Sequence, residues 1–278
     1  MPLATLADVV ATANHEGNAV AGLVCLGWED AAAYAAAAED EGAPAILQAG
    51  PSARAHMPLS VWGALFRHLA ETSRVPIVAH LDHGRSREEC EEAIRCGFSS
   101  VMFDGSALPL DENIAQTAAI ARLAHSAGVS CEGEIGFVGY AAGEREAASS
   151  ALTDPNEAAR FARETGVDAM AVSVGNVHLQ QTGASDIDFA AVQAIQERTN
   201  VALVIHGASG VPYRQRRRLA RETNVAKLNV GTELRRVFGQ TLRDVLQAHP
   251  ERFDRIAILR DTVDPLRTAA REVIASLR

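Results

Sequence analysis

Short apolar segments rich in β-branched residues recur along the chain at wide, fairly regular intervals. Between them lie longer segments in which apolar positions repeat with the spacing of an α-helix. The pattern therefore predicts eight strands that alternate with helices throughout the chain. The predicted strands span residues 19–26, 44–48, 76–81, 99–103, 129–134, 169–174, 202–206 and 226–230.

Several of the intervening segments carry signals that start a helix. Ser86 and Asp111 each stand just before residues of high helix propensity, with acids in the predicted first turn. Asp154 is followed by a proline and, three positions on, by a glutamate, and Pro212 opens the segment 212–222. These signals support a regular alternation of strand and helix.

The predicted strands are apolar on both faces, which is typical of a parallel sheet covered by helices on both sides. Eight such units fit a closed (β/α)8 barrel better than an open sheet, and no linker divides the chain, so we expect one barrel domain over residues 1–278. A helix over 3–15 is expected to cap the bottom of the barrel. Residues 264–278 are predicted to form a helical tail, and 136–152 a long irregular connection.

Composition narrows the class of protein. The 278 residues are 47% hydrophobic and 22% charged, which suits either two small domains or one barrel-sized domain. A net charge of -9 provides no overall positive field for nucleic acid or an anionic membrane. Four cysteines without a CxxC pair, and no apolar segment long enough to span a membrane, favour a reduced, cytoplasmic protein.

Three histidines follow predicted strands at the end of the barrel where active sites gather. His83 follows the third strand, His178 the sixth, and His206 ends the seventh. Any one of them alone is more often a structural or surface residue. Three imidazoles that converge from three strands are typical of a catalytic zinc site with one open position.

The motifs around these histidines resemble those of the class II aldolases, the zinc-dependent enzymes that cleave ketose bisphosphates, and especially their fructose- and tagatose-bisphosphate branch. The resemblance covers nearly the whole chain. The matching motifs are VPIVAHLDHG at 75–84, VMFDGS at 101–106, ENI at 112–114, EGEIG at 132–136, TDP at 153–155, TGVDAMAV at 165–172, HGASGVP at 206–212 and KLNVGTEL at 227–234.

This resemblance implies one zinc ion per subunit, held by His83, His178 and His206. It implies that Asp82 is the acid/base on the hydroxyl at the bond that breaks, although a neighbour of a ligand could instead orient an imidazole. Glu134 is implied to lie near the ligands. The chemistry is consistent, because a metal that polarises a ketone stabilises the charge left by retro-aldol cleavage without a Schiff-base lysine.

Two glycine-containing turns precede helices after the seventh and eighth strands, where barrels of this kind usually bind phosphate. The resemblance implies that these turns hold the phosphate of dihydroxyacetone phosphate, and that an arginine meets the distal phosphate across a subunit contact in a homodimer or homotetramer. The residues concerned are Gly207, Ser209, Asn229, Gly231, Thr232 and Arg260. For the arginine, a solvated surface residue is the simpler interpretation.

The chain departs from the family pattern at three places. In the connection after the fifth strand the expected acid is shifted, so that Glu144 or Glu146 would have to act as the base, or either is only a surface charge. Leu179 and the glutamines after it replace the usual residues beside His178, which makes a monovalent cation doubtful. The first strand ends in 25–28 without the usual asparagine. We therefore expect a ketose phosphate other than the common glycolytic one.

Two other functions fit parts of the pattern. A zinc-dependent barrel hydrolase would use metal-bound hydroxide on an ester or amide, but such enzymes often carry a pair of histidines on the first strand, where this chain has none. A barrel that has lost catalysis and serves as a binding protein would explain the shifted acid. The aldolase remains the first hypothesis.

Overall fold

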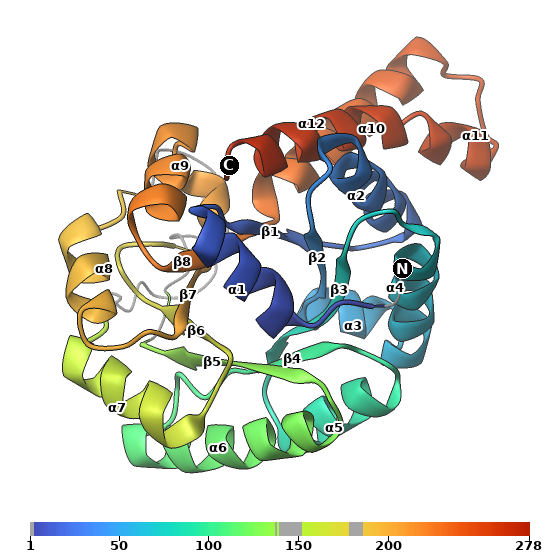
Figure 1. The fold of residues 1–278 in the computed structure, drawn as a ribbon. Helices are drawn as coiled ribbons and strands as arrows, with labels where there is room; N and C mark the ends of the chain where they lie inside the picture. Colours follow the sequence, from blue (N-terminus) through green and yellow to red (C-terminus); the bar gives the residue numbers. More distant parts are fainter. Residues whose placement is uncertain (1–2, 137, 139–151, 178–185) are drawn as a thin grey trace.

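The computed structural model of the chain describes residues 3–136, 138, 152–177 and 186–278. Eight parallel strands follow one another in chain order and close into a barrel, with helices around the outside (Figure 1). The predicted (β/α)8 architecture is therefore confirmed. The strands are β1 (Val20–Val24), β2 (Ala45–Ala49), β3 (Ile77–Gly84), β4 (Ser100–Phe103), β5 (Ser130–Ile135), β6 (Ala169–Val172), β7 (Ala202–Ile205) and β8 (Val225–Val230).

One helix before the barrel, helices between the strands and two further helices at the end of the chain complete the fold. Among the described residues, no helix is long and apolar enough to span a membrane. The helices are α1 (Leu6–Glu16), α2 (Trp28–Glu41), α3 (Pro51–His56), α4 (Leu59–Thr72), α5 (Arg87–Arg95), α6 (Leu110–Ser126), α7 (Pro155–Thr165), α8 (Phe189–Gln196), α9 (Tyr213–Glu222), α10 (Thr232–Ala248), α11 (Arg255–Arg260) and α12 (Val263–Ala275), with a short 3₁₀ turn at Ala208–Gly210.

The helix-start signals mostly act as the sequence predicts. The hydroxyl of Ser86 accepts a hydrogen bond from the Glu89 amide at the start of α5, and the Asp154 carboxylate caps α7. Pro212 is the residue just before α9. The expected start at Asp111 is wrong by a short distance: α6 begins one residue earlier, because Pro109 sets the boundary and leaves Asp111 in the first turn.

Strand β3 differs from its prediction in a way that matters for function. The sequence predicts an end at residue 81, whereas β3 continues to Gly84. Its pairing with β4 shifts register between Leu81 and Gly84, so one extra residue is accommodated there as a bulge. Asp82 and His83 both lie inside this irregular segment, at the carboxyl end of the strand.

Helix α1 closes the amino-terminal end of the barrel, as the sequence predicts (Figure 1). Its apolar face packs against inward-facing residues at the start of the strands, and together they form a separate buried cluster. The cluster contains Leu6, Val9, Val10 and Ala13 of α1 with Val20, Ile46, Val78, Ala169, Ala171, Ala202, Val204 and Ala226 of the strands. The predicted helical tail is present as α12, which packs beside α2.

Polar side chains, rather than the apolar ones found under α1, fill the middle of the barrel. Gln48, His80, Glu132 and Lys227 are fully buried there, at 0% exposure. Barrels of this type usually fill their interior with branched apolar side chains. A polar layer directly below the carboxyl ends of the strands therefore points to a site at that end.

Candidate metal centre and active site

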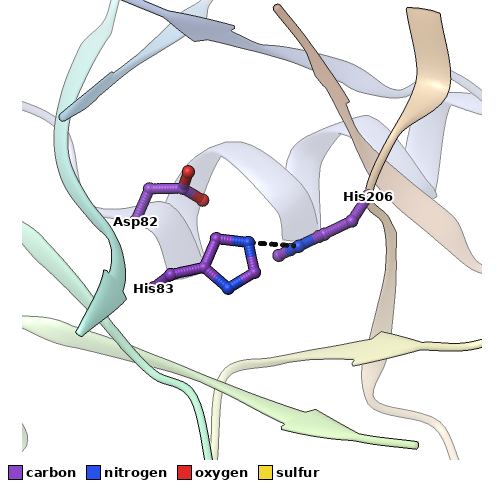
Figure 2. Close-up of side chains that lie close together, drawn as sticks. All are labelled: Asp82, His83 and His206. Carbon is purple, nitrogen blue, oxygen red and sulfur yellow. Dashed lines mark hydrogen bonds between the residues drawn. The ribbon is translucent and has the colours of Figure 1, made fainter. Parts of the chain in front are cut away.

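Two histidines face each other at the carboxyl end of the barrel. His83 comes from the bulge of β3 and His206 directly follows β7 (Figure 2). The Nε2 atom of His83 lies 3.1 Å from Nδ1 of His206, and the two rings are nearly perpendicular, at 84°. Asp82 lies beside them, and one ligand atom from each of the three residues falls within 4.8 Å of the others.

His83 is held by carboxylates on its other side. Its Nδ1 lies 2.9 Å from Oδ2 of Asp104, which follows β4, and 3.5 Å from Oε2 of Glu134 on β5. Burial alone would lower the pKa of His83, but the charges of Asp82, Asp104 and Glu134 raise it to about 9. In Asp104, burial is outweighed by hydrogen bonds with His83 and Ser106, which keep its pKa below the usual range. The site therefore favours a positive charge at His83.

His206 is also held by a carboxylate, that of Glu132 in the middle of the barrel. Its Nε2 lies 3.1 Å from Oε1 of Glu132, and both side chains are fully buried. Burial, followed by the nearby positive charge of His83, lowers the pKa of His206 well below its usual value, so its imidazole is neutral. Because a carboxylate only accepts hydrogen bonds, the ring proton lies on Nε2, and Nδ1 presents a lone pair toward His83.

The positions of the ring protons are compatible with a metal ion between the two imidazoles. Asp104 accepts a hydrogen bond from Nδ1–H of His83, so the Nε2 of a neutral His83 would also present a lone pair. Two lone pairs that face each other at 3.1 Å need a cation between them, either a proton or a metal. Two imidazole nitrogens on a tetrahedral zinc lie about 3.3 Å apart when each Zn–N distance is about 2.0–2.1 Å. The observed separation is close to that value.

A buried carboxylate adjoins this pair. Glu134 is fully buried, and its Oε2 has no hydrogen-bond partner among the described residues. Burial raises its pKa to about 8, against the opposing effect of His83. His83, Asp104 and Glu134 form a second group whose ligand atoms lie within 4.8 Å of one another. Glu134 thus lies next to the candidate ligands, where the sequence analysis expects it.

The third expected ligand, His178, lies outside the described residues, as do Glu144 and Glu146. The segment that makes a monovalent cation doubtful, residues 178–181, lies outside them too. Their roles stay predictions. The described part of the chain brings together two of the three predicted metal ligands.

Asp82 is positioned by two amide side chains. The Nε2 of Gln48 donates to its Oδ1 at 2.8 Å, and the Nδ2 of Asn229 does so at 3.4 Å. Both donors contact Oδ1. No residue in the described part of the chain donates a hydrogen bond to Oδ2. Gly22 on β1 makes room for this arrangement, because a Cβ there would lie 1.9 Å from Oε1 of Gln48 and 2.5 Å from Oδ1 of Asn229. A carboxylate held in this way can accept a proton from a bound hydroxyl.

Arg54 on α3 holds the backbone of the bulge. Its guanidinium donates to the carbonyl oxygen of Asp82 at 2.6 Å and to that of His83 at 3.1 Å. His83 has a φ of 52°, the only positive φ among the described residues that are not glycine. Such a conformation is disfavoured for a residue with a Cβ and persists when its surroundings hold it. Arg54 supplies that restraint, although the sequence analysis does not single it out.

The two predicted phosphate turns are joined to each other. Gly207, directly after His206, has a φ of 66°, which a glycine tolerates. The hydroxyl of Ser209 accepts hydrogen bonds from the amide of Gly231 at 3.2 Å and from that of Glu233 at 3.3 Å. Thr232 is the first residue of α10. The turns therefore meet at the carboxyl end of the barrel, and phosphate binding by Gly207, Ser209, Asn229, Gly231 and Thr232 stays a prediction.

Arg260 does not join this site within one chain. It is exposed at the end of α11, which projects from the side of the barrel (Figure 1). The expectation that it meets a phosphate across a subunit contact stays a prediction, as does the homodimer or homotetramer.

Sequence reasoning missed several residues that support the site: Gln48, Arg54, Asp104, Glu132 and Lys227. Three of these stand in motifs that the sequence analysis quotes, but without a role. The alternation of a strand offered one signal, because Glu132 and Glu134 are two positions apart and must share a face. Arg54 gave no comparable signal, since its role depends on how α3 docks on the end of β3.

Comparisons with known proteins extend over almost the whole chain. The sequence model of the family "Fructose-bisphosphate aldolase class-II" matches residues 4–278. A "Probable fructose-bisphosphate aldolase" of Bacillus subtilis (strain 168) is 34% identical over 277 residues, which cover 99% of this chain and 95% of the relative. A "6-phospho-5-dehydro-2-deoxy-D-gluconate aldolase" of Shouchella clausii (strain KSM-K16) is 39% identical over 240 residues, 84% of this chain and 80% of the relative.

Solved structures show the same fold. The crystal structure of the YdjI aldolase from Escherichia coli K12 is similar with a TM-score of 0.85 at 27% identity, and covers 99% of this chain and 97% of that one. A fructose-bisphosphate aldolase from Campylobacter jejuni has a TM-score of 0.82 at 19% identity, over 99% of this chain and 95% of that one, a likeness in fold alone. The likeness therefore extends far beyond the motifs around the histidines.

Proposed function

The chain belongs to the class II fructose-bisphosphate aldolase family, and from that membership we propose that it is a zinc-dependent aldolase that cleaves a ketose phosphate reversibly to dihydroxyacetone phosphate and an aldehyde. Membership makes it a carbon–carbon lyase of the aldehyde-lyase type. The zinc dependence and the identity of the sugar are the parts that we propose.

One observation carries the proposal for the metal: two imidazole nitrogens face each other at 3.1 Å, and each ring has a carboxylate on its far nitrogen. Metal-binding histidines almost always donate their other N–H to such a partner. His83 and His206 would hold the ion, together with His178 as the sequence predicts. When bound, zinc supplies Lewis-acid polarisation of the substrate's ketone oxygen.

Asp82 would move the proton. Its Oδ1 is held by Gln48 and Asn229, and the residue is only 6% exposed. In the cleavage direction, Oδ2 would take the proton of the hydroxyl on the carbon that becomes the aldehyde. In the reverse direction the same carboxyl returns it. Burial excludes most of the water that would compete for this proton.

An imine mechanism is disfavoured by the chain's amines. Lys227 is the only lysine in the sequence. It is fully buried, and its Nζ lies 2.6 Å from Oε2 of Glu132. An amine that forms a Schiff base must be deprotonated and reach the carbonyl, which this ion pair opposes.

The substrate is proposed at the level of its class. Relatives that cover most of the chain carry the names of two different aldolases, one for fructose bisphosphate and one for 6-phospho-5-dehydro-2-deoxy-D-gluconate. Residues 25–28, which follow β1 and contain no asparagine, and the shifted acid after the fifth strand both depart from the fructose-bisphosphate pattern. We therefore propose a phosphorylated ketose other than the common glycolytic one.

A coupled assay that detects dihydroxyacetone phosphate tests the proposal. Purified enzyme would be offered fructose 1,6-bisphosphate, tagatose 1,6-bisphosphate and 6-phospho-5-dehydro-2-deoxy-D-gluconate, before and after chelation and after zinc is restored. We expect cleavage of at least one sugar, loss of that activity with the chelator, and recovery with zinc. Activity that survives complete metal removal, and that borohydride abolishes in the presence of substrate, would overturn the metal mechanism in favour of an imine on Lys227. Rapid turnover of fructose 1,6-bisphosphate would overturn the proposed departure from glycolysis.

A further inference from the structure

The single lysine of the chain occupies an unusual position. All other basic side chains except the histidines are arginines, yet Lys227 on β8 lies in the middle of the barrel with no exposure. An isolated ammonium in such a place carries a large desolvation cost, so its partners must compensate for it. Its Nζ lies 2.6 Å from Oε2 of Glu132 and 3.2 Å from Nε2 of His80.

The donors and acceptors in this cluster fix one another. A lysine ammonium only donates hydrogen bonds, so Nε2 of His80 must accept, and its Nδ1–H then donates to the hydroxyl of Ser100 at 2.8 Å. Burial, and then the charge of Lys227, lower the pKa of His80 well below its usual value, which agrees with a neutral ring. His80 is thus a fixed acceptor that helps to hold the ammonium in place.

The chain of hydrogen bonds continues from Lys227 through Glu132 to the candidate metal ligand His206. Glu132 uses Oε2 for Lys227 and Oε1 for Nε2 of His206. A carboxylate that receives an ammonium N–H on one oxygen accepts a second hydrogen bond on the other, so the ring proton of His206 stays on Nε2. The Nδ1 lone pair then faces the Nε2 of His83.

We propose that Lys227 is a positioning residue that acts through Glu132 to hold the His206 ring in the one tautomer able to bind a metal ion. Its hydrogen-bond partners are Glu132 and His80, so it would act through them. An ammonium suits this place because one compact group reaches both acceptors, whereas the planar fork of an arginine needs more room and a different arrangement of partners. The inference rests on the metal role of His206 proposed above.

Two single variants and their combination separate this role from a merely structural one. In Lys227→Met, Oε2 of Glu132 loses the Nζ–H donor that fixes the carboxylate, so the side chain can rotate away from Nε2 of His206. In Glu132→Gln, the amide oxygen must turn to the ammonium, so the amide NH₂ faces His206 and drives its proton onto Nδ1. In the double variant, no ammonium constrains the amide, and its oxygen can again accept the Nε2–H of His206.

Zinc affinity by chelator competition and the electronic spectrum of cobalt-substituted protein measure the effect. We expect each single variant to bind zinc about 10–100-fold more weakly, with an altered cobalt spectrum. We expect the double variant to bind zinc more tightly than Glu132→Gln and to recover the wild-type spectrum. Leu6→Ala, which removes a buried side chain at the opposite end of the barrel, is the control for lost stability and should change neither readout.

Labelling with [¹⁵N]lysine adds a direct view, because the chain yields one side-chain signal. We expect the signal of a slowly exchanging ammonium whose shift changes in Glu132→Gln. A rapidly exchanging signal in the wild type, wild-type zinc affinity in both single variants, or a double variant no better than Glu132→Gln would each overturn the role of Lys227. If Lys227→Met does not fold, the comparison between Glu132→Gln and the double variant still decides. A wild-type protein that binds no zinc would instead defeat the proposed function.

Discussion

The same eight strands bury very different side chains at the two ends of the barrel. At the amino-terminal end, valines, isoleucines and alanines pack against α1 in an apolar cluster. From the middle of the barrel to its carboxyl-terminal end, the interior holds the ammonium of Lys227, carboxylates and facing imidazoles. The burial of side chains at the amino-terminal end is explained by the transfer of apolar surface from water. The burial of charged and polar side chains toward the carboxyl-terminal end is not explained in this way.

Unsatisfied atoms sharpen this contrast. Of the buried side-chain oxygens without a hydrogen-bond partner in the described part of the chain, those of Gln48, Glu134, Ser173 and Asn229 belong to residues on or just after strands, toward their carboxyl ends. Native proteins leave few such atoms, and each has a cost. Two further such oxygens, of Asn14 on α1 and of Asn224 just before β8, lie at the amino-terminal end. We infer that the carboxyl end, where most of these atoms gather, is completed by what it binds. The following substitutions test whether the two ends are separable in this way.

The largest effect is expected from His206→Ala. The substitution removes one of the two facing nitrogens, so zinc retention should be lost and kcat/KM should fall by at least about 10³-fold. Metal analysis of the purified protein and the coupled aldolase assay measure the two effects. The far-ultraviolet circular dichroism should stay that of the wild type. An active variant with a full complement of zinc would exclude His206 as a ligand.

Asp82→Asn should separate metal binding from proton transfer. Asparagine keeps the shape of the side chain but cannot accept the proton, so kcat should fall by about 10²–10⁴-fold while zinc stays bound. Zinc content and steady-state kinetics on the same preparation test this. A variant that keeps wild-type kcat would disprove the acid/base assignment, and one that loses its zinc would indicate that Asp82 acts on the metal instead.

Arg54→Met should loosen the bulge of β3. Without hydrogen bonds to the carbonyls of Asp82 and His83, the left-handed backbone at His83 loses its restraint, and zinc affinity should fall about tenfold. Chelator competition measures this change. Arg67→Met is the matched control, since Arg67 also donates to a backbone carbonyl but is exposed on α4. Equal zinc affinities in both variants would show that Arg54 does not support the site.

Gly22→Ala tests the packing under Asp82. The new methyl group would displace the amides of Gln48 and Asn229, so kcat should fall about tenfold, as expected for loss of a hydrogen bond to a charged group worth about 1.5 kcal/mol. Zinc affinity should not change. Gly239→Ala on α10 is the control, because a Cβ there meets only the end of the Arg243 side chain, at 3.8 Å. If kcat in Gly22→Ala matches that of Gly239→Ala, the two amides do not position Asp82.

The contrast between the two ends also explains what could be predicted from the sequence. The number and order of the strands, the capping helix and the parallel barrel follow from hydrophobic periodicity and are confirmed, whereas the predicted end of β3 at residue 81 is wrong. The family and the aldolase class, predicted from motifs, are confirmed as well. The hydrolase and the inactive binding protein are not favoured by the comparisons.

The supporting residues of the site were harder to predict, for physical reasons. Glu132 and Lys227 act by a contact between β5 and β8, which only barrel closure brings together. Hydrophobic periodicity does not predict the bulge in β3, because residues 82–84 lack the apolar, β-branched side chains typical of a strand, although Gly84 pairs with Phe103 of β4. Periodicity reports which face a side chain takes within its own strand, and it carries no information about partners across the barrel.

The smallest effect on the site is expected from Leu6→Ala at the amino-terminal end. Leu6 is fully buried on α1, and its loss should lower the free energy of unfolding by about 2–5 kcal/mol through lost transfer energy and a cavity. Because α1 packs on the strand starts, zinc affinity, kcat and KM should stay at their wild-type values below the melting temperature. Thermal unfolding and the coupled assay measure the two properties separately. A clear loss of zinc affinity in this variant would mean that the strands transmit packing changes along their length, and the two ends could no longer be treated as independent.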